Sequence, residues 1–341
     1  MKHTRALTIF DAVKRFGWPE PGSKIISREI LLGESCNARC LFCCARNLIQ
    51  NTEWLPAETV IGKLRKAIEE DAWLITFSGG EASLYPDMNY VASEAKKVGF
   101  KSVQVLTNGL KLSDIDFVRG WADAGIDEVK ISLHGIDPWT HDYLMDIPGA
   151  FANSMAAVEN LNRCGIKASF NFAVTRVNYK QMPLFAKLAG VDLGVTGFCF
   201  MFSFYSGGML EYADRLNVSY TEAVPYLRTA LRYMKIHGVV IESKMLSNFV
   251  PCVAPELMNL MSDWRNTSVE SSSELTTSAD MTRRMSDNYP ERKMKLPSCA
   301  GCVFRGSCYG VDKGYVAIHG AGEFRPLKAV PSVFPYSTLY P

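Results

Sequence analysis

Short β-rich runs alternate with longer amphipathic segments from about residue 25 to residue 240, and this alternation constrains the fold more than any other feature. The β-rich runs are residues 25–32, 73–77, 102–106, 128–133, 168–174 and 197–203. The helix-like segments are residues 57–71, 87–97, 113–124, 149–164, 180–188 and 221–236. Six strands that alternate with helices predict right-handed βαβ units around a parallel sheet whose apolar strands are buried on both sides. A partial barrel and an open doubly wound sheet both suit this α/β pattern, and both place the chemistry at the carboxyl ends of the strands.

The chain has ten cysteines, and their grouping indicates metal binding. The amino terminus lacks the apolar core and cleavage site of a secretory signal, and the longest apolar run, residues 197–202, is too short to span a bilayer. We therefore expect a cytoplasmic protein with no membrane partner, in which clustered cysteines bind metal rather than form disulfides. The formal net charge is only +2 and no long basic run is present, so we expect no nucleic-acid partner.

The first cysteine group lies directly after the first β-rich run. Cys36, Cys40 and Cys43 are separated by three and then two residues, so one loop can place three thiolates around a cubane cluster. Three protein ligands leave one iron open, as a catalytic metal requires. A zinc knuckle or plain buried cysteines are the alternative, but zinc usually takes four ligands in pairs. Cys44 lies outside the spacing and is interpreted as a bystander.

This C-x3-C-x2-C loop resembles the signature of the radical S-adenosylmethionine (radical SAM) superfamily. The resemblance implies a partial (β/α)6 TIM-like barrel over residues 25–240, preceded by an extension, residues 1–24. It also implies a 4Fe–4S cluster on the three cysteines, SAM chelated to the open iron, and Phe42 packed near the adenine. An electron from a flavodoxin or ferredoxin-type reductant would lead to cleavage of SAM into methionine and a 5′-deoxyadenosyl radical, which then abstracts a hydrogen atom from the substrate.

Polar residues at the ends of successive strands are predicted to bind SAM, as in similar enzymes. After the second strand, the glycines allow close backbone approach and Glu81 can accept a hydrogen bond from the methionyl amino group. Ser132, at the end of the fourth strand, is expected at the ribose hydroxyls. The remaining predictions concern the ribose or the methionyl carboxylate. The full predicted set is Phe42, Gly79, Gly80, Glu81, Thr107, Ser132, Asn171, Thr175 and Arg176. Taken singly, each strand-end residue could equally be a helix cap or a turn residue.

Two further residues are candidates for the reaction itself. His134 follows the fourth strand and could act as a general acid or base, although a satisfied polar residue is the more frequent outcome. Cys199, on the sixth strand, could donate a hydrogen atom to a product radical. Its alternative role is that of a small buried apolar residue.

A second cysteine group lies near the carboxyl terminus. Cys299, Cys302 and Cys308 supply three thiolates, and Cys252 is the best fourth ligand. The C-x2-C-x5-C spacing resembles part of the SPASM/twitch auxiliary-cluster module, which implies a second auxiliary 4Fe–4S cluster within a small Cys-rich module, residues 241–341. A structural zinc is the competing interpretation, because a four-thiolate site suits both metals. The Ser-, Thr-, Asp- and Arg-rich residues 262–286 are expected to form a mobile loop or a weak helix.

The substrate is left open between two classes. A small molecule such as a nucleoside or sugar is favoured because only 35 residues precede Cys36, too few for a peptide-recognition domain. Maturation of a ribosomally made peptide is favoured by the Cys-rich tail. The strand-end pattern is also similar to the enzyme that rearranges GTP, but the terminal residues 338–341 lack that family's glycine pair. A non-catalytic zinc-binding interaction protein is the alternative from another class.

Overall fold

The computed structural model describes residues 27–46, 53–195, 197–239, 245–262, 264, 274–276, 282–284 and 289–332. The predicted extension, residues 1–24, and the terminal residues 338–341 lie outside this description, as does most of the segment 262–286.

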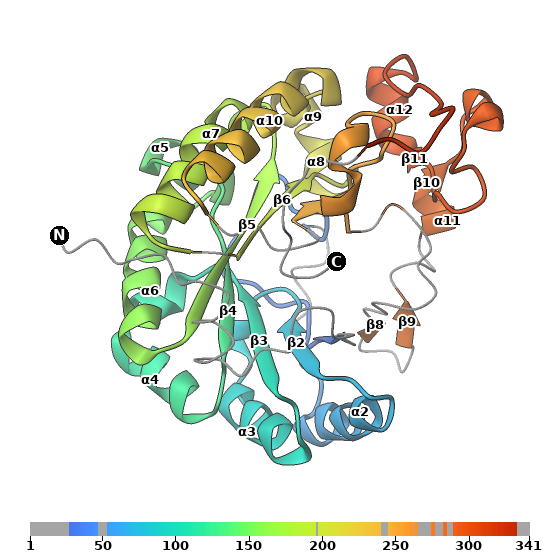
Figure 1. Ribbon diagram of the computed structural model, residues 1–341. Helices are drawn as coiled ribbons and strands as arrows, with labels where there is room; N and C mark the ends of the chain where they lie inside the picture. The colour runs from blue at the N-terminus through green and yellow to red at the C-terminus, as the bar shows by residue number, and fades with distance from the viewer. Residues whose placement is uncertain are drawn as a thin grey trace.

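A curled sheet of seven parallel strands forms the centre of the protein, in the order β1-β2-β3-β4-β5-β6-β7 (Figure 1). The strands are β1 Ser27–Leu31, β2 Leu74–Ser78, β3 Ser102–Thr107, β4 Glu128–Ser132, β5 Lys167–Val174, β6 Gly197–Phe202 and β7 Leu246–Ser247. An open doubly wound sheet reverses its strand order at a switch point, and this sheet does not. The predicted partial barrel is therefore confirmed. The six expected strands are present, and the two-residue β7 is an addition that is too short to give a sequence pattern.

Helices cover the convex side of the curl, whereas the short α8 lies against the cysteine loop (Figure 1). The helices are α2 Ala57–Glu69, α3 Met88–Val98, α4 Ile115–Asp123, α5 Pro138–Met145, α6 Ala150–Cys164, α7 Met182–Ala186, α8 Gly208–Glu211, α9 Ala213–Leu216 and α10 Tyr220–Ile236. Short helical turns are η1 Ala82–Leu84, η2 Leu110–Ser113 and η3 Tyr179–Gln181, and α7 continues as a π-helix, η4 Lys187–Asp192. Helices α3 and α6 end at Gly99 and Gly165 in the left-handed conformation, which glycine adopts without steric cost.

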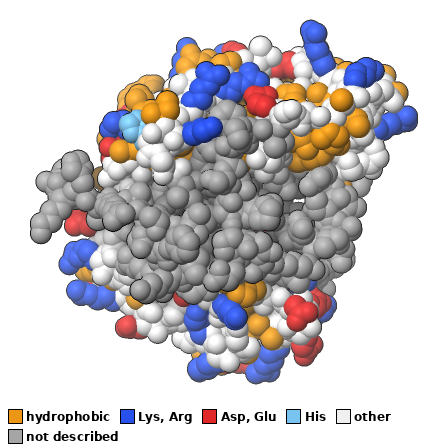
Figure 2. All heavy atoms as spheres, in the orientation of Figure 1, with side chains coloured by type: hydrophobic (Ala, Val, Ile, Leu, Met, Phe, Trp, Pro, Cys, Tyr) orange, Lys and Arg blue, Asp and Glu red, His pale blue; other side chains and the backbone are white. Residues whose placement is uncertain are grey.

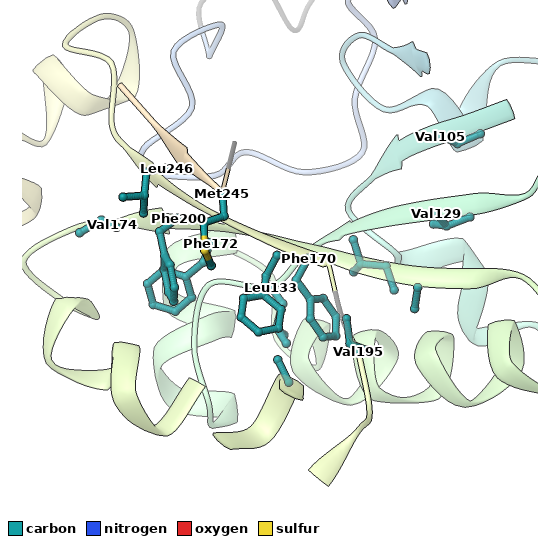
Figure 3. Close-up of a cluster of buried hydrophobic side chains, with 14 of the residues drawn as sticks. Val105, Val129, Leu133, Phe170, Phe172, Val174, Val195, Phe200, Met245 and Leu246 are labelled. Carbon is teal, nitrogen blue, oxygen red and sulfur yellow. The ribbon is translucent and has the colours of Figure 1, made fainter. Parts of the chain in front are cut away.

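The two faces of the sheet differ in polarity. The convex face carries the apolar members of each strand, such as Val105, Val129, Phe172 and Phe200, which pack against the helices (Figure 3). The concave face carries the alternate residues, and most of these are polar: Glu29, Thr76, Ser78, Gln104, Glu128, Lys130, Ser132, Lys167, Ser169 and Asn171. The expected apolar burial on both faces is thus correct only for the convex face, because the curl directs the other face toward a cavity instead of a second helix layer.

The carboxyl-terminal region meets the barrel in two places, because α12 packs beside β6 and α10 while β8 lies against β1 (Figure 1). Its elements are η5 Pro255–Leu260, β8 Glu274–Thr276, β9 Thr282–Arg284, α11 Tyr289–Arg292, β10 Lys293–Met294, η7 Pro297–Gly301, β11 Val311–Asp312 and α12 Lys313–His319. Tyr315 connects this region to the barrel, because its hydroxyl accepts a hydrogen bond from Tyr220 N at 2.9 Å and its ring lies 6.0 Å from that of Phe202. The region therefore shares the core of the barrel.

Figure 2 shows Lys and Arg side chains interspersed with Asp and Glu side chains over the coloured part of the surface. Within the described residues, no helix combines the length and the apolar character needed to cross a membrane.

Candidate active site

A cavity of about 370 Å³ lies inside the curl at the carboxyl ends of the strands. It brings together eleven of the predicted site residues, which come from the cysteine loop and from β2, β3, β4 and β5. They are Cys36, Cys40, Phe42, Cys43, Gly79, Gly80, Glu81, Thr107, Ser132, His134 and Asn171. Residues that follow successive strands in the sequence therefore lie together in one cavity.

The three loop cysteines face this cavity and one another. Burial is the main reason that the pKa of Cys36 rises to about 11, and the nearby charges of Glu81 and Cys43 add to the rise. Burial also raises the pKa of Cys40, followed by the charges of Cys43 and Cys36. Such thiols become thiolates only when a cation compensates their charge. This donor set fits an iron–sulfur cluster with three protein ligands. In the part of the chain that is described, no three His, Cys, Asp or Glu side chains meet closely enough to hold a single metal ion.

Two elements hold the cysteine loop in place from outside. Leu41 N donates to Leu144 O at the end of α5, at 2.9 Å, and Gly208 N at the start of α8 donates to Cys43 O, also at 2.9 Å. A Cβ added at Gly208 would overlap Leu41 O, so the close approach requires glycine. Sequence reasoning missed this support, although the Ser-Gly-Gly run after the sixth strand was a signal for it.

Arg46 adds a third support to the same loop. Its guanidinium donates to Cys40 O at 3.2 Å and to the Tyr212 hydroxyl at 3.3 Å, and it also lies over the Tyr212 ring. The loop is thereby joined to the junction of α8 and α9 as well as to α5. A guanidinium can make several such bonds at once because its donors are fixed in a planar fork.

Glu81 is built into the ends of β2 and β3. It is 2% exposed, and its carboxylate accepts hydrogen bonds from Ser83 N at 2.9 Å, Asn108 N at 2.7 Å and the Thr107 hydroxyl. Burial raises the pKa of Glu81, and these hydrogen bonds oppose the rise. Glu81 thus fixes the rim of the cavity, and its contact with the methionyl amino group stays a prediction.

Gly79 and Gly80 have a related positioning role. Cβ atoms added at these positions would overlap the carbonyl oxygens of Gly33 and Ser35 respectively, just before the cysteine loop. The two glycines therefore let β2 pack directly against the backbone that leads into Cys36. This backbone packing alone requires glycine at both positions, and the predicted close approach of Gly79 and Gly80 to a ligand stays a prediction.

His134 is a fixed hydrogen-bond donor rather than a base. It is 3% exposed, and its Nδ1 accepts a hydrogen bond from Ala173 N at 3.0 Å, which leaves the proton of the neutral ring on Nε2. Burial, and then the neighbouring His141, holds the pKa of His134 well below its usual value. The ring lies edge-on to Phe42 at 4.5 Å. The general acid–base role is therefore disfavoured at neutral pH, and Nε2–H is available to a ligand in the cavity.

Three predicted residues do not line the cavity. The Thr175 hydroxyl is fully buried and donates to Asn178 Oδ1 at 3.0 Å, while Arg176 points outward to Asn217 O at 2.6 Å and to Glu222 at 3.4 Å. Both follow the last residue of β5, where the chain turns away from the barrel. Cys199 lies on the concave face beside Asn171 in the strand register, but it is not among the residues that line the cavity.

The second cysteine group also converges. Cys252, Cys299, Cys302 and Cys308 line one small cavity in the carboxyl-terminal region. Burial raises the pKa of Cys252 to about 12, and the other three thiols contribute to the rise. Four thiols on one cavity fit a closed metal site, whether iron–sulfur or zinc.

A family model described as "Radical SAM superfamily" matches residues 30–189, which contain the cysteine loop and strands β1 to β5. Residues 30–189 are a radical SAM domain. Such a domain implies a 4Fe–4S cluster and SAM, and the residues that line the cavity fit both.

Curated relatives of the chain include enzymes with different names. A probable GTP 3′,8-cyclase of Sulfolobus acidocaldarius is 28% identical over 169 residues, which cover 49% of this chain and 53% of the relative. An AdoMet-dependent heme synthase of Methanosarcina barkeri is 27% identical over 180 residues, which cover 51% of this chain and 49% of the relative. The chain thus spans about half the length of the curated relatives it matches.

Solved structures share the fold over more of the chain. Streptococcus suis SuiB bound to precursor peptide SuiA has a TM-score of 0.64 at 14% identity, covering 93% of this chain and 77% of SuiB. Native anSMEcpe with bound AdoMet has a TM-score of 0.58 at 14% identity, covering 86% of this chain and 94% of the other. At these identities the likeness concerns the fold alone.

Proposed function

We propose that the chain is a radical SAM enzyme that reductively cleaves SAM and abstracts a hydrogen atom from a small-molecule or peptide substrate. One observation carries the proposal: Cys36, Cys40 and Cys43 face the same cavity as the polar strand ends. When bound, the cluster and SAM would supply the electron and the 5′-deoxyadenosyl radical, since a cofactor carries such chemistry and the protein orients it.

The chain's own residues have binding and orienting roles in this proposal. Cys36, Cys40 and Cys43 would hold the cluster. The Nε2–H of His134 donates to an acceptor beside Phe42, while Ser132 and Asn171, neighbours in the strand register, offer a hydroxyl and an amide. Hydrogen bonds in such an enclosed site position a ligand more effectively than in open solvent.

A second candidate substrate class is a ribosomally made peptide. The SPASM-like convergence of Cys252, Cys299, Cys302 and Cys308 supports it, as does the fold shared with peptide-bound SuiB. We propose that residues 241–341 form an auxiliary module with a second 4Fe–4S cluster. A flavodoxin or ferredoxin-type reductant and a cytoplasmic location belong to the same proposal, and ten free cysteines suit a reducing compartment.

Anaerobic purification and reconstitution test the proposed clusters and the proposed cleavage of SAM. We expect a brown protein with about eight irons per chain if both clusters form. Its electron paramagnetic resonance signal should change when SAM is added, and the reduced protein should form 5′-deoxyadenosine. Deuterium transfer from labelled guanosine or from a labelled peptide into 5′-deoxyadenosine separates the substrate classes. A colourless protein that carries two zinc ions would instead support the non-catalytic alternative.

A further inference from the structure

Basic side chains surround the cavity that the second cysteine group lines. Three of them line it together with the four thiols, and a fourth, Lys328, adjoins it because its Nζ donates to Gly301 O at 3.4 Å. All four side chains are exposed, and we call them the basic rim: Lys295, Arg305, Arg325 and Lys328. Four cations therefore lie around four thiols.

Hydrogen bonds hold the segments of the basic rim together. Val303 N donates to Leu327 O at 2.8 Å, and Lys295 Nζ donates to Arg305 O at 2.6 Å. The two guanidinium groups have no such task, since within the described residues neither Arg305 nor Arg325 forms a side-chain hydrogen bond or an ion pair. Their donors are therefore available to a partner.

The charge of the surrounding region is one-sided. Residues 289–332 contain seven Lys and Arg against three Asp and Glu, a net charge of +4, whereas the whole chain carries only +2. Neighbouring donors already engage two of the three acids, because Asp312 caps α12 and Glu323 accepts from the Thr221 hydroxyl at 2.8 Å. The field of this region is therefore positive, and it attracts a negatively charged surface.

Apolar side chains are exposed beside the basic rim. Val303 directly follows Cys302 and is 47% exposed, and Val330, close to Lys328 in the chain, is 65% exposed. Figure 2 shows Lys and Arg side chains at the edge of a hydrophobic patch at its upper right, where Figure 1 places α12 and β11. A small apolar surface bordered by charges suits a brief encounter with another protein.

We infer that the basic rim is the docking surface for an acidic electron-transfer protein of the flavodoxin or ferredoxin type. This inference rests on the proposed function and deepens it by placing its reductant. The four thiols are half-buried and share their cavity with the rim, so a protein that docks here covers the metal site that they would form. That position favours an electron carrier over a nucleic acid, which has no use for contact with a metal site.

Equilibrium binding tests this inference without turnover. Reconstituted protein is titrated calorimetrically with oxidised flavodoxin, at about 50 mM and at about 300 mM NaCl. We expect the affinity of the wild type to be at least about tenfold lower at the higher salt concentration, because salt screens the attraction between exposed charges.

Two double variants assign the effect to the basic rim. Arg305→Glu with Arg325→Glu should weaken binding at the lower salt concentration at least about tenfold. Arg65→Glu with Arg163→Glu makes the same change in net charge at exposed positions of α2 and α6, and it should weaken binding less than about twofold. The iron content of both variants should match that of the wild type, which excludes damage to the metal sites.

The choice of reductant provides a second measurement. With excess dithionite, the Arg305→Glu and Arg325→Glu double variant should form 5′-deoxyadenosine as fast as the wild type, because a small reductant needs no docking surface. With reduced flavodoxin below its dissociation constant, the same variant should be at least about tenfold slower.

Three results would overturn the inference: no binding of flavodoxin to the wild type at millimolar concentration, equal weakening in the control variant, or tighter binding of a single-stranded oligonucleotide than of flavodoxin. The last result would assign the basic rim to nucleic acid. The proposed function fails by a separate criterion, namely no 5′-deoxyadenosine from the wild type with excess dithionite.

Discussion

At the scale of single residues, His134 and His141 show how backbone contacts decide the chemistry of a side chain. The sequence identifies a histidine after the fourth strand but not its tautomer, because the Ala173 N–H that fixes it comes from another strand. His141 lies behind it, and its Nδ1 accepts from His134 N at 3.0 Å. Both imidazole rings are therefore neutral and are held in place by backbone N–H groups.

Stability should depend on pH through His141. Burial lowers its pKa to about 4 from an ordinary 6.5, so the unfolded chain binds the proton more readily and folding loses stability as the pH falls below 6.5. Between pH 7.5 and 5 we expect a loss of about 2 kcal/mol from this group. Urea unfolding of His141→Asn should show that much less pH dependence than the wild type, whereas His237→Asn, on the surface, should match the wild type.

The ligand assignment is tested by Cys40→Ala. Because Cys40 is the most buried of three thiols that face one another, its loss should prevent cluster assembly at the first site and abolish 5′-deoxyadenosine formation. Iron analysis and product chromatography measure both effects. Cys164→Ala, at the end of α6, is the matched control and should keep both. Retained SAM cleavage in Cys40→Ala would refute the assignment.

At the scale of elements, β5 and its exit show where prediction from the sequence stops. The strand could be predicted because Phe170, Phe172 and Val174 alternate with smaller or polar residues, but the chain leaves the barrel immediately after Val174. Thr175 and Arg176 therefore serve the fold, and periodicity carries no signal for such a turn. Helix α5 was missed because its eight residues are too short for a clear amphipathic pattern.

The contact between α8 and the cysteine loop should control cluster geometry. In Gly208→Ala, the new Cβ would displace Leu41 and with it the flanking cysteines. Since small misplacements at a reacting centre are costly, we expect a loss of SAM cleavage on the order of 100-fold. Assays of 5′-deoxyadenosine and circular dichroism would separate this loss from unfolding.

A glycine with open space around it gives the control. Gly62 lies in α2 with no atom within 4 Å of an added Cβ, so Gly62→Ala should keep full activity and raise stability by up to about 1 kcal/mol. Unchanged activity in Gly208→Ala would show that the loop does not depend on this contact.

At the scale of the whole molecule, two cysteine groups far apart in the sequence occupy separate cavities of one folded unit. Their existence was predictable from spacing alone. The alternation of strands and helices left two sheet arrangements open, and the family resemblance indicated the barrel. The polar concave face was not, because sequence alternation shows which residues share a face but not which face receives helices. Tyr315, which joins the carboxyl-terminal region to Tyr220, likewise appears only in three dimensions.

The two metal sites should be separable. Cys302→Ala removes one of four converging thiols, so the iron content should fall from about eight to about four per chain while the first cluster remains. Iron analysis and Mössbauer spectroscopy would measure this directly. An unchanged iron content accompanied by the loss of one zinc ion would identify the second site as structural zinc.

The mixed lining of the cavity has a consequence for the thermodynamics of binding. Apolar side chains such as Phe42, Leu106 and Met201 lie beside the polar groups of Ser132 and Asn171. A ligand that fills the cavity therefore buries apolar surface and also exchanges hydrogen bonds with water. The heat capacity should fall on binding, and a ligand that leaves a buried polar group of the cavity unpaired should bind more weakly.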